Sequence, residues 1–324
     1  MFYGKSCSQA SVSLWLLVVA VSPASANPPR FEHVMNIGSE GVGKGQFKYV
    51  EDLAFSKDGH LLATDGSHAW VQVFDKTTGE FLTRFGGQGD DDHNLDKPEG
   101  IAVDPDGNVF VGDYNTGFIK KYDPSYRWLL TFSQYGSEPG QNMKSEFMDI
   151  HNGKLYLPDI GNHRINVFDL SGQPLFDFGG KGAAPGKMNT PEAAKFNGDG
   201  KLYISDLRND RIQVFDGDGK LLSVWGRSGA NESELKSPAG LAFDAHDNVY
   251  VTEIGNNRVQ VFDKNGKFLT MWGKKGSGTG EFGNLHGVLI DKATGYVYVA
   301  DTANNRIQVF KPVGGTMVTT EVVR

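Results

Sequence analysis

The chain has 324 residues, of which 39% are hydrophobic and 22% are charged, a composition typical of globular proteins. Its formal net charge is −7, and an acidic surface disfavours a general role in binding nucleic acids or anionic membranes. The only cysteine is Cys7, which excludes disulfide stapling, cysteine catalysis and Cys-based zinc sites from the remainder of the sequence.

An apolar run near the N-terminus, Val12–Val21, follows Lys5 and precedes the small residues of Ala24–Ala26. The run is too short for an ordinary membrane span, so this pattern predicts a secretory signal peptide over residues 1–26, cleaved after Ala26. The alternative is an uncleaved N-terminal anchor. We expect a secreted or periplasmic protein with no membrane insertion after cleavage, and a single domain over residues 27–324.

The stretch 239–273 shows how the remainder of the chain is organised. It holds four short apolar runs separated by turns rich in Asn, Asp and Gly: Gly240–Phe243, Val249–Thr252, Val259–Phe262 and Phe268–Trp272. Runs of this length with such breaks predict strands joined by hairpins. One unit is therefore a four-stranded antiparallel meander, which must stack on copies of itself to cover its apolar faces.

The sequence supplies those copies. The acidic residue that closes the second run recurs about every 47 residues, at Asp65, Asp113, Asp159, Asp206, Glu253 and Asp301. Four strands per period of this length predict an all-β fold, a six-bladed β-propeller. We place the repeats at about 38–85, 86–135, 136–178, 179–225, 226–272 and 273–312.

The sixth repeat lacks a fourth strand of the usual type. The segment Phe31–Gly38 resembles the outer strands of the other repeats, which predicts that this N-terminal strand completes the last blade and closes the ring. The segment Thr316–Val323 is the rival for the same position.

Four segments carry a resemblance to a known family. Asp159–Phe168, Asp206–Phe215, Glu253–Phe262 and Asp301–Phe310 resemble the NHL repeat, as in DLRNDRIQVF and DTANNRIQVF. The resemblance covers residues 31–312 and implies a six-bladed propeller. NHL propellers include ligand-binding and protein-binding modules, domains of tripartite-motif ubiquitin ligases, and peptidyl-α-hydroxyglycine α-amidating lyases. The wider six-bladed class adds metal-dependent lactonases and esterases.

A first candidate site lies where the innermost strands begin. Counting back from the repeat acid places Glu51, Glu99 and Glu192 there, with His286 in the sixth blade; Ala239 takes the position in the fifth blade, and Met148 takes it approximately in the third. Carboxylates and an imidazole around one axis suit Ca²⁺ or a transition metal such as Zn²⁺. The resemblance to the lyases implies zinc-binding histidines at this position, which Leu285–Val288 matches and the other blades do not. The alternative is a channel that is polar because it is wet.

A second candidate is a repeated arginine, at Arg164, Arg211, Arg258 and Arg306, which Trp70 and Phe118 replace in the first two blades. One interpretation makes these arginines clamps for carboxylate or phosphate groups; the other makes them structural, each paired with a repeat acid or turn carbonyls. Trp70 and Phe118 follow Glu51 and Glu99 in adjacent blades. That combination predicts a pocket for a small polar ligand with an apolar side, which His68 and Tyr114 are expected to border.

The leading functional hypothesis is an exported, monomeric scaffold that binds a ligand or a protein through the loops on one face. The alternative is a metal-dependent lyase or hydrolase at the channel mouth, with Glu51, Glu99, Glu192 and His286 as ligands. In that hypothesis Arg211 or Arg258 holds a substrate carboxylate. Nucleic-acid binding through the arginines is a third hypothesis, which the acidic net charge disfavours.

Overall fold

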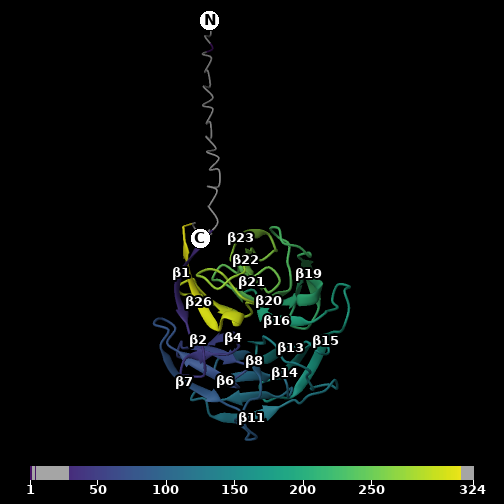
Figure 1. Ribbon diagram of the computed structural model, residues 1–324. Coiled ribbons are helices and arrows are strands. Elements are labelled where there is room, and N and C mark those ends of the chain that lie inside the picture. Colours follow the sequence, from purple (N-terminus) through teal and green to yellow (C-terminus); the bar gives the residue numbers. More distant parts are fainter. Residues whose placement is uncertain (2–3, 5–28, 315–324) are drawn as a thin grey trace.

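The computed structural model describes residues 29–314, together with Met1 and Gly4. Its strands form six four-stranded antiparallel sheets, which are arranged around a central axis (Figure 1). The predicted all-β, six-bladed propeller is therefore confirmed. The predicted signal peptide and the rival closing strand at 316–323 lie outside the described residues.

Each blade is a meander whose first strand lines the axis and whose fourth strand lies outside. The blades are β4 (Val50–Phe55), β5 (Leu61–Asp65), β6 (Trp70–Phe74), β7 (Phe81–Gly86); β8 (Pro98–Val103), β9 (Val109–Asp113), β10 (Ile119–Tyr122), β11 (Trp128–Phe132); β12 (Asp149–His151), β13 (Lys154–Asp159), β14 (Arg164–Asp169), β15 (Pro174–Gly179); β16 (Pro191–Phe196), β17 (Leu202–Asp206), β18 (Arg211–Phe215), β19 (Leu221–Trp225); β20 (Pro238–Phe243), β21 (Val249–Glu253), β22 (Arg258–Phe262), β23 (Phe268–Trp272); and β24 (Val288–Asp291), β25 (Tyr296–Asp301), β26 (Arg306–Val313), β1 (Arg30–Ile37).

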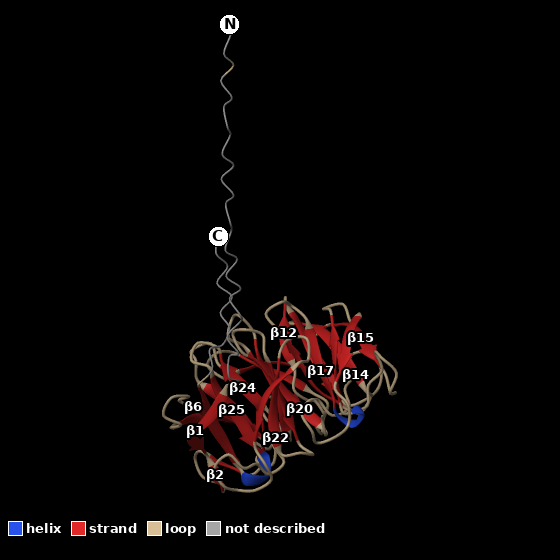
Figure 2. Ribbon diagram, turned by 90° about the horizontal axis from the view of Figure 1, so that it is seen from above, coloured by secondary structure: helices blue, strands red, loops and turns tan. Residues whose placement is uncertain are grey.

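The remaining regular structure lies in connectors. A short parallel pair, β2 (Ser39–Glu40) and β3 (Gln46–Phe47), precedes the first blade. Two 3-10 turns, η1 (Leu207–Asn209) and η2 (Thr302–Asn304), follow repeat acids; helices of this kind are the blue segments among the red strands of Figure 2. No helix among the described residues is long and apolar enough to cross a membrane.

The N-terminal strand closes the ring. β1 pairs with β26 in antiparallel register, with Phe31 opposite Pro312 and Ile37 opposite Ile307, so the two chain ends of the propeller lie side by side in Figure 1. The Phe31 ring also stacks on Trp272 of the fifth blade, with the ring centroids 4.1 Å apart. The prediction that Phe31–Gly38 completes the sixth blade is confirmed, with the observed strand shifted by one residue.

The core lies between the blades. Second strands such as β5 and β9 are buried along their whole length, whereas the outer strand β7 is exposed over much of its length. A strand covered by blades on both sides has no solvent face, which is why these segments read as continuous apolar runs. This packing fixes the inner strands rigidly around the axis.

Candidate functional site

The repeat acid of each blade positions the start of an inner strand. Asp206 accepts a hydrogen bond from the backbone N–H of Asn189 at 2.7 Å, and Glu253 accepts one from Lys236 at 2.8 Å. All six repeat acids are buried. A buried carboxylate is stable only when hydrogen bonds replace its water, so this residue recurs because the fold needs it.

The starts of the inner strands are linked to one another around the axis. Gly287 N–H donates to the Glu51 carbonyl at 3.0 Å, and Phe147 N–H donates to the Glu192 carbonyl at 3.1 Å. The Thr64 hydroxyl donates to the Glu99 carbonyl at 2.9 Å. These links hold Glu51, Glu99 and Glu192 at the start of the channel.

The sixth blade joins the same ring, because the Thr252 hydroxyl donates to the His286 carbonyl at 2.5 Å. The structure thus brings all four sequence-predicted residues to one end of the channel.

The sequence reasoning missed one member of this group. The third blade contributes Glu146, which is 4% exposed; Met148, named for that position, lies further along the channel and lines a cavity. Gly100 allows the close approach, since a Cβ there would lie 2.0 Å from the Glu146 carbonyl oxygen. The first hairpin of the third blade is shorter than in the other blades. Counting back from its repeat acid, Asp159, with one fewer residue would therefore have identified Glu146.

Four glutamates and one histidine therefore share a buried site, which we call the carboxyl cluster (Glu51, Glu99, Glu146, Glu192 and His286). Burial raises the pKa of Glu192 to about 8, with the Glu99 carboxylate contributing. Burial and the neighbouring carboxylates likewise raise the pKa values of Glu51 and Glu146 well above the usual range. Like charges this close cannot all ionise, so the cluster holds protons at neutral pH.

Two basic groups contact the cluster carboxyl groups: Lys97, which lies beside the cluster, and its own member His286. Lys97 contacts the Glu99 carboxylate; burial opposes its charge, but Glu99 and its neighbours raise the pKa of the ammonium. Burial lowers the pKa of His286 to about 4, so its ring is neutral at neutral pH. Its Nδ1 lies 3.0 Å from the Asn284 carbonyl oxygen. That oxygen accepts a hydrogen bond from Nδ1–H, which leaves Nε2 with its lone pair.

Metal binding at this end of the channel stays a prediction. The Glu51 Oε2 atom is buried without a hydrogen-bond partner among the described residues, and it lies 3.5 Å from His286 Nδ1. Within residues 29–314, however, no group of three or more His, Cys, Asp or Glu side chains is arranged to hold a metal ion. The carboxyl groups contact each other, Tyr49 and Lys97 instead.

The four repeated arginines are paired inside the fold. The Arg258 guanidinium donates to Glu253 at 2.5 Å and to the carbonyls of Ala230 and Glu234 at 2.6 and 2.9 Å. Its counterparts pair in the same way with repeat acids and turn carbonyls, as seen at Arg164, Arg211 and Arg306. This geometry matches the structural interpretation, and a ligand role for these arginines stays a prediction.

The first two blades have Trp70 and Phe118 in place of the repeated arginine. Trp70 lies between the His68 ring, at 4.9 Å between centroids, and the Arg84 guanidinium, 3.4 Å from its ring centroid. Phe118 is half-buried, with the Lys120 ammonium 6.0 Å from its ring centroid. The third strands begin on the same face as the inner strands, because neighbouring strands are antiparallel.

Closer to the axis, the half-buried Tyr114 ring lies between two ammonium groups, with Lys97 Nζ at 4.0 Å and Lys144 Nζ at 5.1 Å. Lys97 also lies 5.2 Å from the Tyr49 ring. We call Tyr49, His68, Trp70, Tyr114 and Phe118 the aromatic sector; they belong to the first two blades, on the face where the inner strands begin. Aromatic faces beside cations can stack on an apolar group and hold a polar one.

Comparisons with known sequences agree with the observed repeats. Residues 230–321 match a family described as a 6-bladed beta-propeller, and residues 95–122 match the NHL repeat. The protein brain tumor of Drosophila melanogaster is 26% identical over 168 residues, which is 51% of this chain and 16% of that protein. The chain therefore spans only a small part of this relative's length.

Solved structures share the architecture. A protein of unknown function from Bacteroides thetaiotaomicron superposes with a TM-score of 0.66 and 14% identity, over 88% of this chain and 76% of that one. Virginiamycin B lyase from Staphylococcus aureus superposes with a TM-score of 0.61 and 14% identity, over 88% of this chain and 100% of that one. At such identity the likeness concerns the fold. The chain is a six-bladed β-propeller, and its residues 95–122 match the NHL repeat.

Proposed function

We propose that this propeller is an exported scaffold that binds a small ligand or a protein partner through the aromatic sector. One observation carries the proposal: four blades keep an internally paired arginine, and two adjacent blades replace it with Trp70 and Phe118. The arginine serves packing within its own blade, so a departure confined to neighbouring blades points to a role beyond the fold.

The chemistry of the sector supports a polar ligand with an apolar side. Trp70 and Tyr114 are half-buried aromatic side chains, and Lys97 and Lys144 place ammonium groups beside Tyr114. Half-buried aromatic side chains next to cations are typical of recognition surfaces.

A thermal-shift screen tests the proposal. The purified chain is melted with a set of small carboxylates, phenols and sugars, beside the double variant Trp70→Arg/Phe118→Arg, which restores the residue that the other blades carry. A compound that raises the melting temperature of the wild type should have no effect on this variant. The matched control is Val224→Arg, an exposed apolar position on β19. An equal shift in the double variant would place the binding site elsewhere.

A lyase or hydrolase activity is the second candidate, and one observation favours it. The carboxyl cluster combines a neutral His286, able to accept a proton at Nε2, with Glu192, whose raised pKa keeps it able to donate one. Groups with pKa values moved apart are the usual acid–base pair of an active site. A metal held by Glu51, Glu99, Glu192 and His286 would belong to this candidate, although the observed side-chain positions do not form such a set.

This second candidate is tested with virginiamycin B, because one of the similar structures is a lyase named for that compound. Its consumption is followed by chromatography with the wild type and with His286→Ala. Consumption that is lost in the variant would support the activity. If the wild type and a buffer blank leave the compound equally intact, this reaction is excluded and the scaffold proposal is unaffected.

A further inference from the structure

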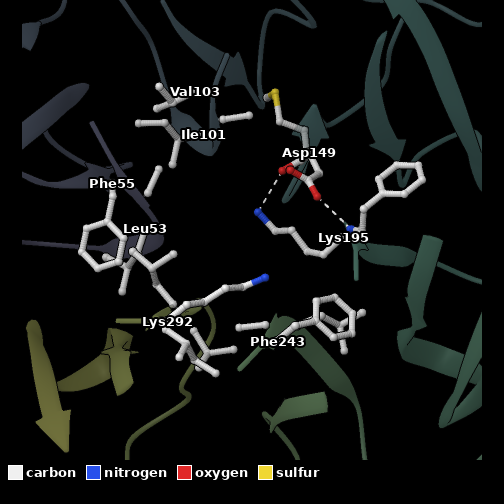
Figure 3. A pocket seen from close by; sticks show the side chains of 17 residues that line it. Leu53, Phe55, Ile101, Val103, Asp149, Lys195, Phe243 and Lys292 are labelled. Carbon is white, nitrogen blue, oxygen red and sulfur yellow. Dashed lines mark hydrogen bonds between the residues drawn. The ribbon is translucent and has the colours of Figure 1, made fainter. Parts of the chain in front are cut away.

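A second recess lies at the other end of the channel, where the inner strands end. It is a cavity of about 260 Å³ lined by residues of all six blades, among them Leu53, Phe55, Ile101, Leu241 and Phe243. Figure 3 shows Phe55 and Phe243 on different sides of this space. The carboxyl cluster belongs to the beginnings of the same strands, so the cavity is a separate site from the aromatic sector.

The cavity has a cationic floor. Lys195, the fifth residue of β16, donates from Nζ to the Met148 carbonyl at 2.8 Å and lies 3.5 Å from the Asp52 carboxylate. A lysine ammonium has three donors, and these two contacts leave one for the cavity. The nearby Asp149 carboxylate already accepts hydrogen bonds from the backbone of Phe196 and Ile150, at 2.8 and 2.9 Å.

A second cation lies at the rim. Lys292 follows β24, lines the cavity and is exposed; its ammonium points into the space between the apolar walls in Figure 3. None of the ion pairs within residues 29–314 includes Lys292. Lys195 at the floor is already paired with Asp52, so Lys292 at the rim supplies the cation without a partner among the described residues. An apolar recess with such a cation at its rim suits a molecule with a hydrocarbon body and one anionic group.

We propose that this cavity binds a small amphipathic carboxylate, with its apolar body against the inner strands and its carboxylate between Lys292 and Lys195. The volume sets the size class, because an apolar cavity of about 150 Å³ accommodates benzene. A medium-chain fatty acid or a substituted benzoate matches a cavity of about 260 Å³. The proposal is independent of the aromatic sector, so either one can fail alone.

Calorimetric titration with octanoate tests the proposal, with octylamine and octanol as probes that share the hydrocarbon body. Octanoate should bind, octylamine should not, and Lys292→Gln should weaken octanoate binding about tenfold through loss of one charge-assisted contact. Lys292→Arg should retain binding. The matched control is Lys220→Gln, an exposed lysine outside the cavity.

A filling variant, Val103→Trp, tests the location, because Val103 lines the cavity. It should abolish octanoate binding while keeping the circular-dichroism spectrum of the wild type. If this variant fails to fold, the comparison of probes and the Lys292 variants still decide the question. Absence of octanoate binding, equal binding of octanoate and octylamine, or unchanged binding in Lys292→Gln would each overturn the proposal.

Discussion

Lys195 of the fourth blade reaches across the central channel to Asp52 of the first, with 3.5 Å between Nζ and Oδ2, although the two residues are 143 positions apart in sequence. First and fourth blades face each other in a six-bladed ring. Asp52 is 1% exposed and also accepts a hydrogen bond from Ile101 N–H at 3.2 Å. This ion pair therefore joins two opposite blades across the channel.

Removing one partner of this pair should be costly. Burial raises the pKa of Asp52, and Lys195 counteracts that rise by stabilising the carboxylate. We expect Lys195→Met to lower the free energy of unfolding by about 3 kcal/mol, because it leaves a buried charge without its partner. Urea denaturation measures the change. The double variant Lys195→Met/Asp52→Asn should recover part of the loss, and an unaltered stability of the single variant would show that the pair contributes nothing.

Ring closure depends on β1. Phe31 stacks on Trp272 and meets Tyr250 edge-on, at 4.1 and 5.9 Å between centroids. We expect Phe31→Ala to destabilise the propeller by about 2 to 4 kcal/mol through loss of this contact between the last two blades. Val34→Ala, at a position on the same strand that is 40% exposed, should change the unfolding free energy little. Equal effects of the two variants would contradict a closing role for Phe31.

The carboxyl cluster makes stability depend on pH. Because the pKa of Glu192 rises from 4.5 to about 8 on folding, the folded chain binds more protons than the unfolded chain within that range, and stability falls as pH rises through it. His286 acts oppositely, since its pKa falls from 6.5 to about 4; its stabilising contribution is complete above pH 6.5 and is lost toward pH 4. From pH 6.5, the ordinary pKa of His286, to about pH 8, the raised pKa of Glu192, the effect of Glu192 on stability is therefore not opposed by His286.

In that window we expect wild-type stability to decrease with pH, and Glu192→Gln to flatten the slope. Chemical denaturation at closely spaced pH values measures it. The control is Glu232→Gln, at an exposed glutamate. A slope that is unchanged in Glu192→Gln would mean that this carboxyl ionises normally in the folded protein.

Chelation separates the two candidate functions. The cluster carboxyls share protons and contact Lys97, so protons compete with cations at neutral pH. The scaffold proposal predicts no stoichiometric metal by elemental analysis and no change in the melting temperature with EDTA. A stoichiometric metal, with a chelator-sensitive melt that disappears in Glu51→Ala/His286→Ala, would favour the enzyme, because an ion that binds only the folded state stabilises it.

The architecture was readable from the sequence because the fold repeats its constraints. The repeat acid recurs since each blade must satisfy the same backbone donors, as Asp206 does for Asn189, and its spacing therefore counts the blades. The closing strand was predictable from its resemblance to the other outer strands. Glu146 was missed because the third blade departs from the common spacing.

Contacts across the channel could not be read in this way. The separation of Asp52 and Lys195, 143 residues or three repeats, places them on opposite blades, but it does not show that the two side chains meet across the channel. The protonation of the cluster depends on how closely Glu51, Glu146 and Glu192 approach, which is a property of the assembled ring.

Binding through the aromatic sector is tested most directly by hydrogen exchange, measured on the wild type with and without a compound that raises its melting temperature. Exchange of backbone amides should slow in residues 66–70 and 113–118, beside Trp70 and Phe118. Protection confined to the turns at the other end of the channel, such as 244–248, would contradict binding through the aromatic sector.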